Sequence, residues 1–292
     1  MRLFDLGGQT AFVTGAGSGI GRAVALALAR RGCHVALADI DAANLAQSAW
    51  MLRTQGVRVT THVLDVADRA AVQALPLAVH DAHQRVDLLV NNAGVLRDKS
   101  FAKMTLEDFR FVVDVHLMGA VNCTKAVWES MRERNYGRIV MTTSSSGLYG
   151  NFGQSNYGAA KMALVGLMQT LAIEGAKNDI RVNCLAPTAH TRMTEDLGAG
   201  LPLEALDTAL VTPGLLHLVG EDAPSRCILA AGAGGFERAY VTLTQGVHLV
   251  GPDAPEQVGA RFDAISDRTG EIVPEAGAAQ AMLELTKAQR SL

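Results

Sequence analysis

Three residues near the middle of the chain have the types and spacing needed for proton transfer. Ser144, Tyr157 and Lys161 lie in the run SSSGLYGNFGQSNYGAAK, from 144 to 161. Residues four apart share one face of a helix, so Lys161 is expected beside Tyr157. A phenol with a pKa of about 10 is a poor base at neutral pH, but a neighbouring positive charge favours the phenolate. Ser144, at the end of a predicted strand, is expected to hold a substrate oxygen. The alternative is an ordinary amphipathic helix pair.

A second group of residues has the pattern of a phosphate-binding turn. The run TGAGSGIG, from Thr14 to Gly21, lies between a short apolar strand and an Ala/Leu-rich helix. Glycines allow positive φ and close backbone approach, and a helix N-terminus favours a pyrophosphate. The spacing differs from the commoner GxGxxG, and a purely structural left-handed turn is the alternative. The candidate cofactor residues in this run are Gly15, Gly17, Ser18, Gly19, Ile20 and Gly21.

An acidic residue follows the glycines at the distance expected for ribose recognition. Asp39 ends the predicted strand 34–39. A carboxylate about twenty residues after the glycines accepts both ribose hydroxyls of NAD, and it would repel the 2′-phosphate of NADP. We therefore expect NAD as the cofactor. The alternative is that Asp39 caps the helix that begins near Ala42, a role that Asp41 could fill equally well.

Strand and helix patterns alternate along the chain. Near-continuous apolar strands between helices predict a parallel sheet covered on both faces. Right-handed crossovers then give a doubly wound α/β Rossmann fold of about seven strands, whose ligands bind at the carboxyl ends of the strands. The predicted strands are 9–13, 34–39, 57–64, 86–90, 137–143, 180–186 and 226–231, and the predicted helices are 19–31, 42–55, 68–84, 105–132, 154–177 and 207–220. We expect this domain to span 1–236, with an extension, 237–292, packed on it or on a neighbouring subunit.

Together, these motifs resemble the short-chain dehydrogenase/reductase family. The stretches VDVHLMGAV and NCLAPTAHTRMT look like members that act on (3R)-hydroxyacyl-CoA. The resemblance implies an enzyme that interconverts a secondary alcohol and a ketone by hydride transfer to or from NAD. It also implies roles for three residues: Tyr157 is the general acid/base, Lys161 lowers the phenol pKa and binds a ribose hydroxyl, and Ser144 orients the substrate oxygen.

The resemblance implies further cofactor contacts. In the family, the aspartate of a pair such as Asp65-Val66 contacts the adenine, and a turn such as Asn-Asn-Ala-Gly shapes the cofactor cleft. Thr191 matches the position that meets the nicotinamide carboxamide, with an N-cap for a helix near Met193 as the alternative. The chain departs from the family's Pro-Gly form at Thr188. The candidates from this comparison are Asp65, Val66, Asn92, Ala93, Gly94, Pro187 and Thr191.

Two polar residues have open roles. The family usually has Asn where this chain has His116, in a helix that bends to route water toward the lysine. His116 is a catalytic candidate because an imidazole titrates in the physiological range; the alternatives are a hydrogen-bonding scaffold or an ordinary structural histidine. Gln154, just before Tyr157, is a candidate substrate contact, with a helix cap as the alternative.

Composition narrows the function classes. The chain has 292 residues, 49% of them apolar, and a net charge of −3. Because this charge gives no sign of a basic surface, we expect neither nucleic acid nor an anionic membrane as a partner. Four widely spaced cysteines fit no metal site. The sequence contains no run of eighteen apolar residues, so we expect no membrane span. The sequence shows neither a signal peptide nor a peroxisomal S-K-L ending, so a cytoplasmic enzyme is expected.

The sequence also leads to expectations about the substrate and the oligomeric state. We expect a small-molecule substrate, either an acyl-CoA or a steroid-like compound. Its specificity is expected to come from the extension and from the segment 188–206, which is either an apolar lid or a plain surface connection. Lys99, Arg192 and Arg238 are candidates for a CoA diphosphate. A hydroxysteroid dehydrogenase, a β-ketoacyl reductase and a catalytically silent dinucleotide-binding regulator are the alternatives. A homodimer or homotetramer is expected, because the helices 105–132 and 154–177 carry apolar residues on more than one face.

Overall fold

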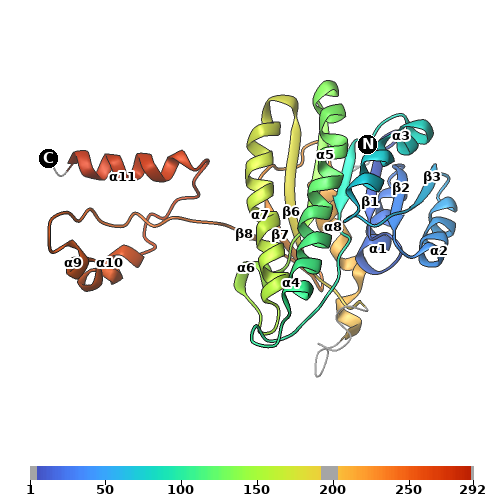
Figure 1. Ribbon diagram of the computed structural model, residues 1–292. Coiled ribbons are helices and arrows are strands. Elements are labelled where there is room, and N and C mark those ends of the chain that lie inside the picture. The colour runs from blue at the N-terminus through green and yellow to red at the C-terminus, as the bar shows by residue number, and fades with distance from the viewer. Residues whose placement is uncertain (1–4, 192–202, 291–292) are drawn as a thin grey trace. The chain divides into compact units, whose positions relative to one another are not determined.

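The computed structural model of the protein describes residues 5–191 and 203–290. It contains one sheet of eight strands in the order β3-β2-β1-β4-β5-β6-β7-β8 (Figure 1). Every pair from β3 to β7 is parallel. The doubly wound fold predicted from the sequence is confirmed. The strands are β1 Thr10–Thr14, β2 His34–Asp39, β3 Val59–Val63, β4 Leu88–Asn91, β5 Gly137–Thr142, β6 Ile180–Thr188, β7 Ile228–Gly232 and β8 Gly235–Ala239.

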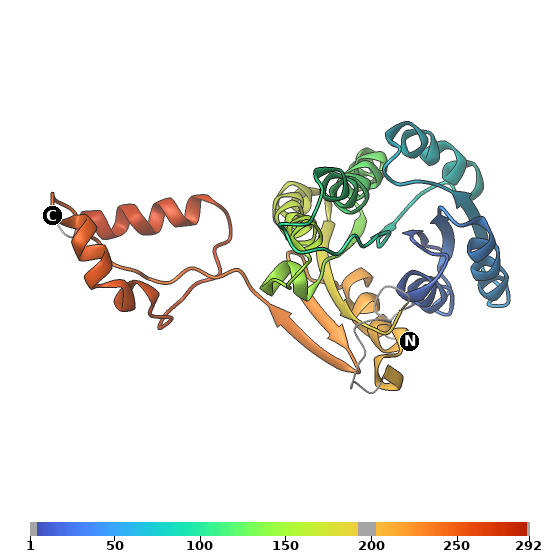
Figure 2. The same ribbon diagram turned by 60° about the horizontal axis from the view of Figure 1, so that its bottom comes forward.

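Helices cover both faces of this sheet. Helices α1, α2 and α8 pack together on one face, and α3, α5 and α7 lie on the other (Figure 2). Because both faces are covered, every residue of the central strands β4 and β5 is buried. The helices of this part are α1 Gly19–Ala29, α2 Ala42–Arg53, α3 Arg69–His83, α4 Leu106–Val113, α5 Gly119–Arg134, α6 Ser145–Tyr149, α7 Ser155–Gly175 and α8 Thr212–Val219.

The eighth strand was not among the predicted elements. A turn of two residues joins β7 to β8, and these residues, Ala233 and Gly234, have φ of 50° and 80°. The two strands lie side by side in Figure 2. Positive φ at both central residues is the requirement of a type I′ hairpin turn. The sheet therefore gains a strand by a hairpin, where the regular alternation of strands and helices predicts none.

The predicted helix 105–132 is interrupted. A π-helical segment, Asp114–Met118, separates α4 from α5 and contains His116. Such π turns occur within α-helices as single turns, frequently at functional sites. The interruption changes the direction in which the His116 side chain points relative to an uninterrupted helix.

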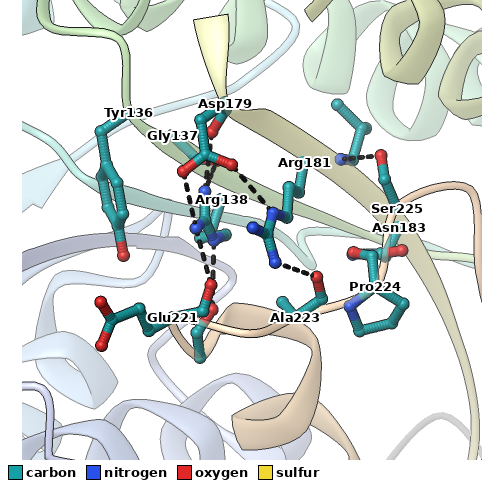
Figure 3. Close-up of polar contacts among 12 residues, drawn as sticks. Tyr136, Gly137, Arg138, Asp179, Arg181, Asn183, Glu221, Ala223, Pro224 and Ser225 are labelled. Atoms are coloured by element: carbon teal, nitrogen blue, oxygen red, sulfur yellow. Dashed lines mark hydrogen bonds and ion pairs between the residues drawn. The ribbon is translucent and has the colours of Figure 1, made fainter. Parts of the chain in front are cut away.

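A buried arginine ties together the amino-terminal ends of β5 and β6. Arg138 is fully buried and donates to the carbonyl oxygens of Gly220 at 3.1 Å and Glu221 at 2.9 Å. It also binds Asp179 through its carbonyl oxygen at 2.7 Å and its carboxylate at 3.1 Å (Figure 3). The guanidinium lies 4.3 Å from the centre of the Tyr136 ring. This network holds the end of the sheet opposite the catalytic candidates.

The chain divides into two compact units, Met1–Arg238 and Ala239–Leu292. The second unit contains the helices α9 Ala254–Ala260, α10 Phe262–Ser266 and α11 Ala278–Arg290, and an antiparallel bridge between Leu243 and Ile272. None of its residues between 239 and 289 is buried. Among the residues that the structure describes, no helix has the length and apolar character required to cross a membrane.

Candidate active site

A cavity of about 280 Å³ lies at the carboxyl ends of the central strands. It brings together candidates that are far apart in the sequence. The proposed proton-transfer residues and Gln154 line it, together with part of the glycine turn and the end of β6. The sequence candidates in its lining are Ile20, Asn92, Gly94, His116, Ser144, Gln154, Tyr157, Lys161, Pro187 and Thr191.

Tyr157 and Lys161 lie one turn apart on α7. The Lys161 Nζ is 5.4 Å from the centre of the Tyr157 ring and donates to the Thr142 carbonyl oxygen at 2.5 Å. Ser144 follows β5 and caps α6, its Oγ accepting from Ser146 N at 3.2 Å. The end of one strand and the first turns of one helix therefore position all three groups.

The Tyr157 hydroxyl is set for acid/base chemistry by competing effects. Burial raises the pKa of Tyr157, a hydrogen bond with the Ser144 side chain lowers it, and the negative charge of Asp98 raises it. The net direction is upward, which favours the neutral phenol. A positive charge in the cavity is therefore needed before Tyr157 can act as a base near neutral pH.

Lys161 is nearly inaccessible to solvent. Burial lowers the pKa of Lys161 to about 7, and the nearby Cys184 opposes this change. Its ammonium is thus close to the point of losing its proton in the physiological range. A negative charge that forms beside it, such as a phenolate, favours its protonated form.

His116 packs its ring edge against Tyr157. The two ring centres are 5.1 Å apart at an angle of 85°, and His116 Nε2 lies 3.0 Å from Val95 N and 2.8 Å from Val95 O. A Cβ on Gly94 would lie 2.3 Å from His116 Cε1, so only glycine fits beside this ring. Burial and the charge of Lys161 lower the pKa of His116 to about 3. The physiological titration expected from the sequence is therefore wrong, and the ring is neutral at working pH.

A second, much smaller cavity lies behind Lys161. Its volume is about 10 Å³, and Asn91, His116 and Lys161 are among its lining residues. Asn91 Oδ1 and His116 Nδ1 are both buried without a hydrogen-bond partner among the described residues. A cavity of this size is at the lower limit for one water molecule, and such waters usually bond to otherwise unsatisfied buried polar groups.

The glycine turn forms a cradle made of backbone. Gly15 and Gly19 have φ of 63° and 53°, and a Cβ on Gly21 would lie 2.1 Å from the Gly15 carbonyl oxygen. Thr14 Oγ1 accepts from the backbone N–H groups of Asn92 and Ala93 at 3.0 and 3.1 Å. The two predicted cofactor motifs are thus joined, and the turn fits a pyrophosphate that approaches the backbone at the start of α1.

Asp39 lies directly against this turn. Its Oδ2 accepts from Gly17 N at 2.8 Å, and a Cβ on Gly17 would lie 2.7 Å from that oxygen. Asp41 caps α2 instead, accepting from Asn44 N at 3.0 Å, so the capping alternative for Asp39 is excluded. An ionised carboxylate has about four acceptor positions, so Asp39 retains capacity for ribose hydroxyls.

Arg22, the one arginine within α1, forms hydrogen bonds with residues of α2. Arg22 Nε donates to Ser48 Oγ, and its Nη2 donates to Gln47 Oε1, both at 2.9 Å. It also contacts the Gly17 carbonyl oxygen. These bonds hold the guanidinium against α2 and the Gly17 carbonyl oxygen.

The remaining cofactor candidates have different positions. Thr191 lies beside the turn, since a Cβ on Gly19 would be 3.3 Å from Thr191 Cγ2. Asp65 is exposed and accepts from Ala67 N at 2.9 Å, and Val66 is buried against Gly119; neither lines the main cavity. The alternative that Thr191 caps a helix near Met193 lies outside the described residues.

The structure adds little support for the three residues proposed to bind a CoA diphosphate. Lys99 Nζ pairs with Asp108 at 2.9 Å. Arg192 and most of the predicted lid lie outside the described residues, and Arg238 is in β8. The sequence reasoning also missed the hydrogen bonds of Gln154 with Asp98, Ser146 and Asn151. Within 5–191 and 203–290, no cluster of histidine, cysteine or acidic residues could hold a metal ion.

Comparison with known proteins identifies relatives along most of the chain. The family model described as short chain dehydrogenase matches residues 9–201. A short-chain type dehydrogenase/reductase of Mycobacterium tuberculosis is 39% identical, covering 88% of this chain and 94% of the relative. Peroxisomal multifunctional enzyme type 2 of Drosophila melanogaster is 41% identical, covering 78% of this chain but 39% of the relative.

Solved structures show the same relationship. The full-length Drosophila enzyme matches with a TM-score of 0.82 and 33% identity, over 98% of this chain and 50% of that one. The protein described here thus spans half of that longer chain. An NAD⁺-bound xylitol dehydrogenase matches with a TM-score of 0.71 and 28% identity, over 80% of this chain and all of the other. The protein belongs to the short-chain dehydrogenase family and is an oxidoreductase of that family.

Proposed function

We propose that the protein is an NAD-dependent dehydrogenase that interconverts a (3R)-hydroxyacyl-CoA and the corresponding 3-ketoacyl-CoA. One observation carries the proposal: a single cavity is lined by Ser144, Tyr157 and Lys161 and also by Ile20 and Asn92 of the two cofactor motifs. An alcohol held at the serine and tyrosine hydroxyls would therefore lie next to a dinucleotide at the glycine turn. The resemblance of VDVHLMGAV and NCLAPTAHTRMT to family members that act on (3R)-hydroxyacyl-CoA supports the acyl-CoA class.

In the oxidation direction, the chain's residues hold the substrate and remove its proton. Ser144 Oγ orients the hydroxyl, and the phenolate of Tyr157 accepts the proton. The ammonium of Lys161 favours that phenolate and binds a ribose hydroxyl. Bound NAD supplies the hydride acceptor and the positive ring that favours the ionised phenol. In reduction the same phenol donates its proton to the ketone oxygen.

His116 acts in this scheme as a neutral partner. Its Nε2 is bound to the Val95 backbone. The residue also lines the small cavity beside Lys161, and its Nδ1 is buried without a hydrogen-bond partner among the described residues. A water there would accept from the Lys161 ammonium and donate to His116 Nδ1 and Asn91 Oδ1, so these groups would hold the protonated lysine in place. In this way His116 serves in place of the Asn that is usual in the family.

The preference for NAD over NADP is proposed from the position of Asp39. Its carboxylate is fixed by Gly17 N at the edge of the turn, where it would accept ribose hydroxyls and repel a 2′-phosphate. The NAD⁺-bound relative supports the same cofactor class. The remaining candidates, Ser18 and Asp65 among them, are proposed contacts of the same nucleotide.

The cofactor and acyl-CoA proposals have a direct test. Oxidation of (3R)- and (3S)-hydroxyacyl-CoA, a free 3-hydroxy acid and a hydroxysteroid is followed by NADH absorbance. We expect the (3R)-thioester to have by far the highest kcat/KM. Turnover only of free steroid alcohols would favour a hydroxysteroid dehydrogenase, and preference for acyl-carrier thioesters a β-ketoacyl reductase. Binding of NAD without turnover of any alcohol would favour the catalytically silent regulator.

Tyr157→Phe tests the mechanism itself. Removing a positioned acid/base costs about 10²–10⁴-fold in rate, so kcat should fall by that factor. The dissociation constant of NADH, measured by fluorescence, should stay close to that of the unmutated protein because the glycine turn and Asp39 are untouched. Near-normal turnover in this variant would contradict the role of Tyr157.

Assembly as a homodimer or homotetramer is proposed from exposed apolar residues on one side of the catalytic unit. Phe111, Met162 and Ile173 on α4 and α7 are 40%, 40% and 49% exposed. No residue between 239 and 289 in the second unit is buried, which supports packing of that unit on the catalytic unit or on a neighbouring subunit. A cytoplasmic location stays a prediction.

A further inference from the structure

The side-chain amide of Gln154 joins three segments of the chain beside the cavity. The residue is 6% exposed, and its Nε2 donates to Asp98 Oδ2 at 2.6 Å. Its Oε1 accepts from Ser146 Oγ at 2.7 Å and from Asn151 Nδ2 at 3.1 Å. The amide oxygen thus has both acceptor positions filled by protein groups. This pattern differs from that of a side chain that waits to bind substrate, which is the role predicted from the sequence.

Two neighbouring hydrogen bonds join the same loops. Lys99 N donates to Gly153 O at 2.9 Å, and the fully buried Asn156 donates through Nδ2 to Arg97 O at 3.1 Å. The segment 97–99 is therefore fastened, residue after residue, to the segment 153–156 that directly precedes Tyr157. Of these links, only that of Gln154 uses a charged partner.

Gln154 also reaches the catalytic serine. Its bond to Ser146 holds the first turn of α6, and Ser146 N donates in turn to Ser144 Oγ at 3.2 Å. One amide thus connects the loop after β4, the loop after β5 and the start of α7. Movement of that amide would displace Ser144 and Tyr157 relative to each other.

We propose that Gln154 is a positioning residue: its amide holds Asp98, Ser146 and Asn151 in the arrangement in which Ser144 and Tyr157 act, and keeps the Asp98 carboxylate at a fixed place beside the cavity. The inference rests on the proposed function, because it concerns the reaction of these two hydroxyls. A misplacement of about 1 Å can reduce a rate about 10²-fold. Burial is the largest cause that raises the pKa of Tyr157, and the charge of the held Asp98 carboxylate raises it further.

Variants that exchange the amide of Gln154 and the carboxylate of Asp98 test the hydrogen bond between these two residues. Gln154→Glu places two carboxylates together and should lower kcat/KM by about 10–100-fold. Asp98→Asn keeps an acceptor for Gln154 and should change kcat/KM by less than about threefold. The double variant Asp98→Asn with Gln154→Glu restores one amide and one carboxylate at this position and should recover most of the loss. Glu107→Gln, which removes an exposed carboxylate from the first turn of α4, is the matched control.

A second measurement requires no substrate. The ionisation of Tyr157 is followed by phenolate absorbance against pH, with the Tyr157→Phe protein subtracted. Asp98→Asn should move this titration to lower pH and Gln154→Glu to higher pH, while Glu107→Gln leaves it in place. Thermal unfolding confirms that each variant is folded.

The outcomes separate this inference from the proposed function. Full kcat/KM in Gln154→Glu, a double variant no better than Gln154→Glu, or an unmoved Tyr157 titration would overturn the role of Gln154. Absence of turnover in the unmutated protein with every 3-hydroxyacyl-CoA would instead overturn the proposed function. In that case the phenolate titration still decides whether Gln154 holds the charge of Asp98 at the site.

Discussion

Replacing Arg138 by methionine should destabilise the protein far more than its distance from the cavity suggests. The guanidinium is fully buried and donates to the carbonyl oxygens of Gly220, Glu221 and Asp179 and to the Asp179 carboxylate (Figure 3). Methionine fills similar volume but donates none of these bonds. Because Arg138 also donates to the Gly137 carbonyl oxygen at 2.9 Å, four carbonyl oxygens would lose this donor. Among the described residues, the partly exposed Asp179 carboxylate would keep only its bond with Arg181.

The expected cost follows from these contacts. Removing one partner of a buried, hydrogen-bonded ion pair costs about 3–5 kcal/mol, and each buried acceptor left unsatisfied costs about 1–3 kcal/mol. Asp179 is 42% exposed and regains water, so the cost comes mainly from the four carbonyl acceptors. At about 1 kcal/mol each, the lower end of that range, we expect about 3–5 kcal/mol in total. Ser144 lies six residues further along the same strand and its exit, about 20 Å away, so kcat at a temperature where the variant is folded should be unchanged.

Arg181→Met provides the control. Arg181 pairs with the same Asp179 at 2.9 Å but is 32% exposed, so water replaces its bonds and the cost should stay below about 1.5 kcal/mol. Urea unfolding is followed by circular dichroism at one protein concentration, which keeps the contribution of assembly the same for all variants. A cost for Arg138→Met below about 1 kcal/mol, or equal to that of Arg181→Met, would refute the reasoning.

Three further predictions concern the site and the assembly. Asp39→Ala should lower kcat/KM with NAD by about 10–100-fold, because hydrogen bonds to a charged group are lost. It should also narrow the preference for NAD over NADP. Equal kcat/KM with both cofactors in the unmutated protein would contradict the role of Asp39. Because the pKa of His116 is about 3, its ring is neutral above that value, so His116→Asn should keep the shape of the pH–rate profile between about pH 5 and pH 9; loss of a limb in that range would show that the ring titrates. Light scattering at micromolar concentration should give two or four times the chain mass of 30.8 kDa, and a monomer mass would exclude the proposed assembly.

Much of the candidate site could be predicted because its residues lie at the ends of regular elements. The spacing of Tyr157 and Lys161 fixes their common helix face, and the glycine turn depends on neighbours in sequence. Strands that are apolar along their whole length predict a sheet buried on both sides. The carboxyl ends of such strands then converge at one edge, where the cavity lies.

The features that the sequence did not predict depend on contacts between distant segments. The hydrogen bond from Gln154 to Asp98 joins positions 56 residues apart, and that from Arg138 to Gly220 joins positions 82 residues apart. The neutral state of His116 follows from burial and from Lys161, neither of which a motif specifies. The strand β8 has five residues, none of them buried, so it lacks the apolar pattern by which the other strands are found.

The close packing of the glycine turn also limits how this sequence can diverge. Any other amino acid at Gly21 adds a Cβ 2.1 Å from the Gly15 carbonyl oxygen, so even alanine requires the backbone to shift. At Asp39 the proposed recognition group is the end of a side chain whose partners include the backbone N–H of Gly17, and an exchange there should alter hydrogen bonds without moving the main chain. Descendants of this sequence should therefore acquire a different nucleotide specificity by drift at the end of β2, while the turn itself stays invariant under selection.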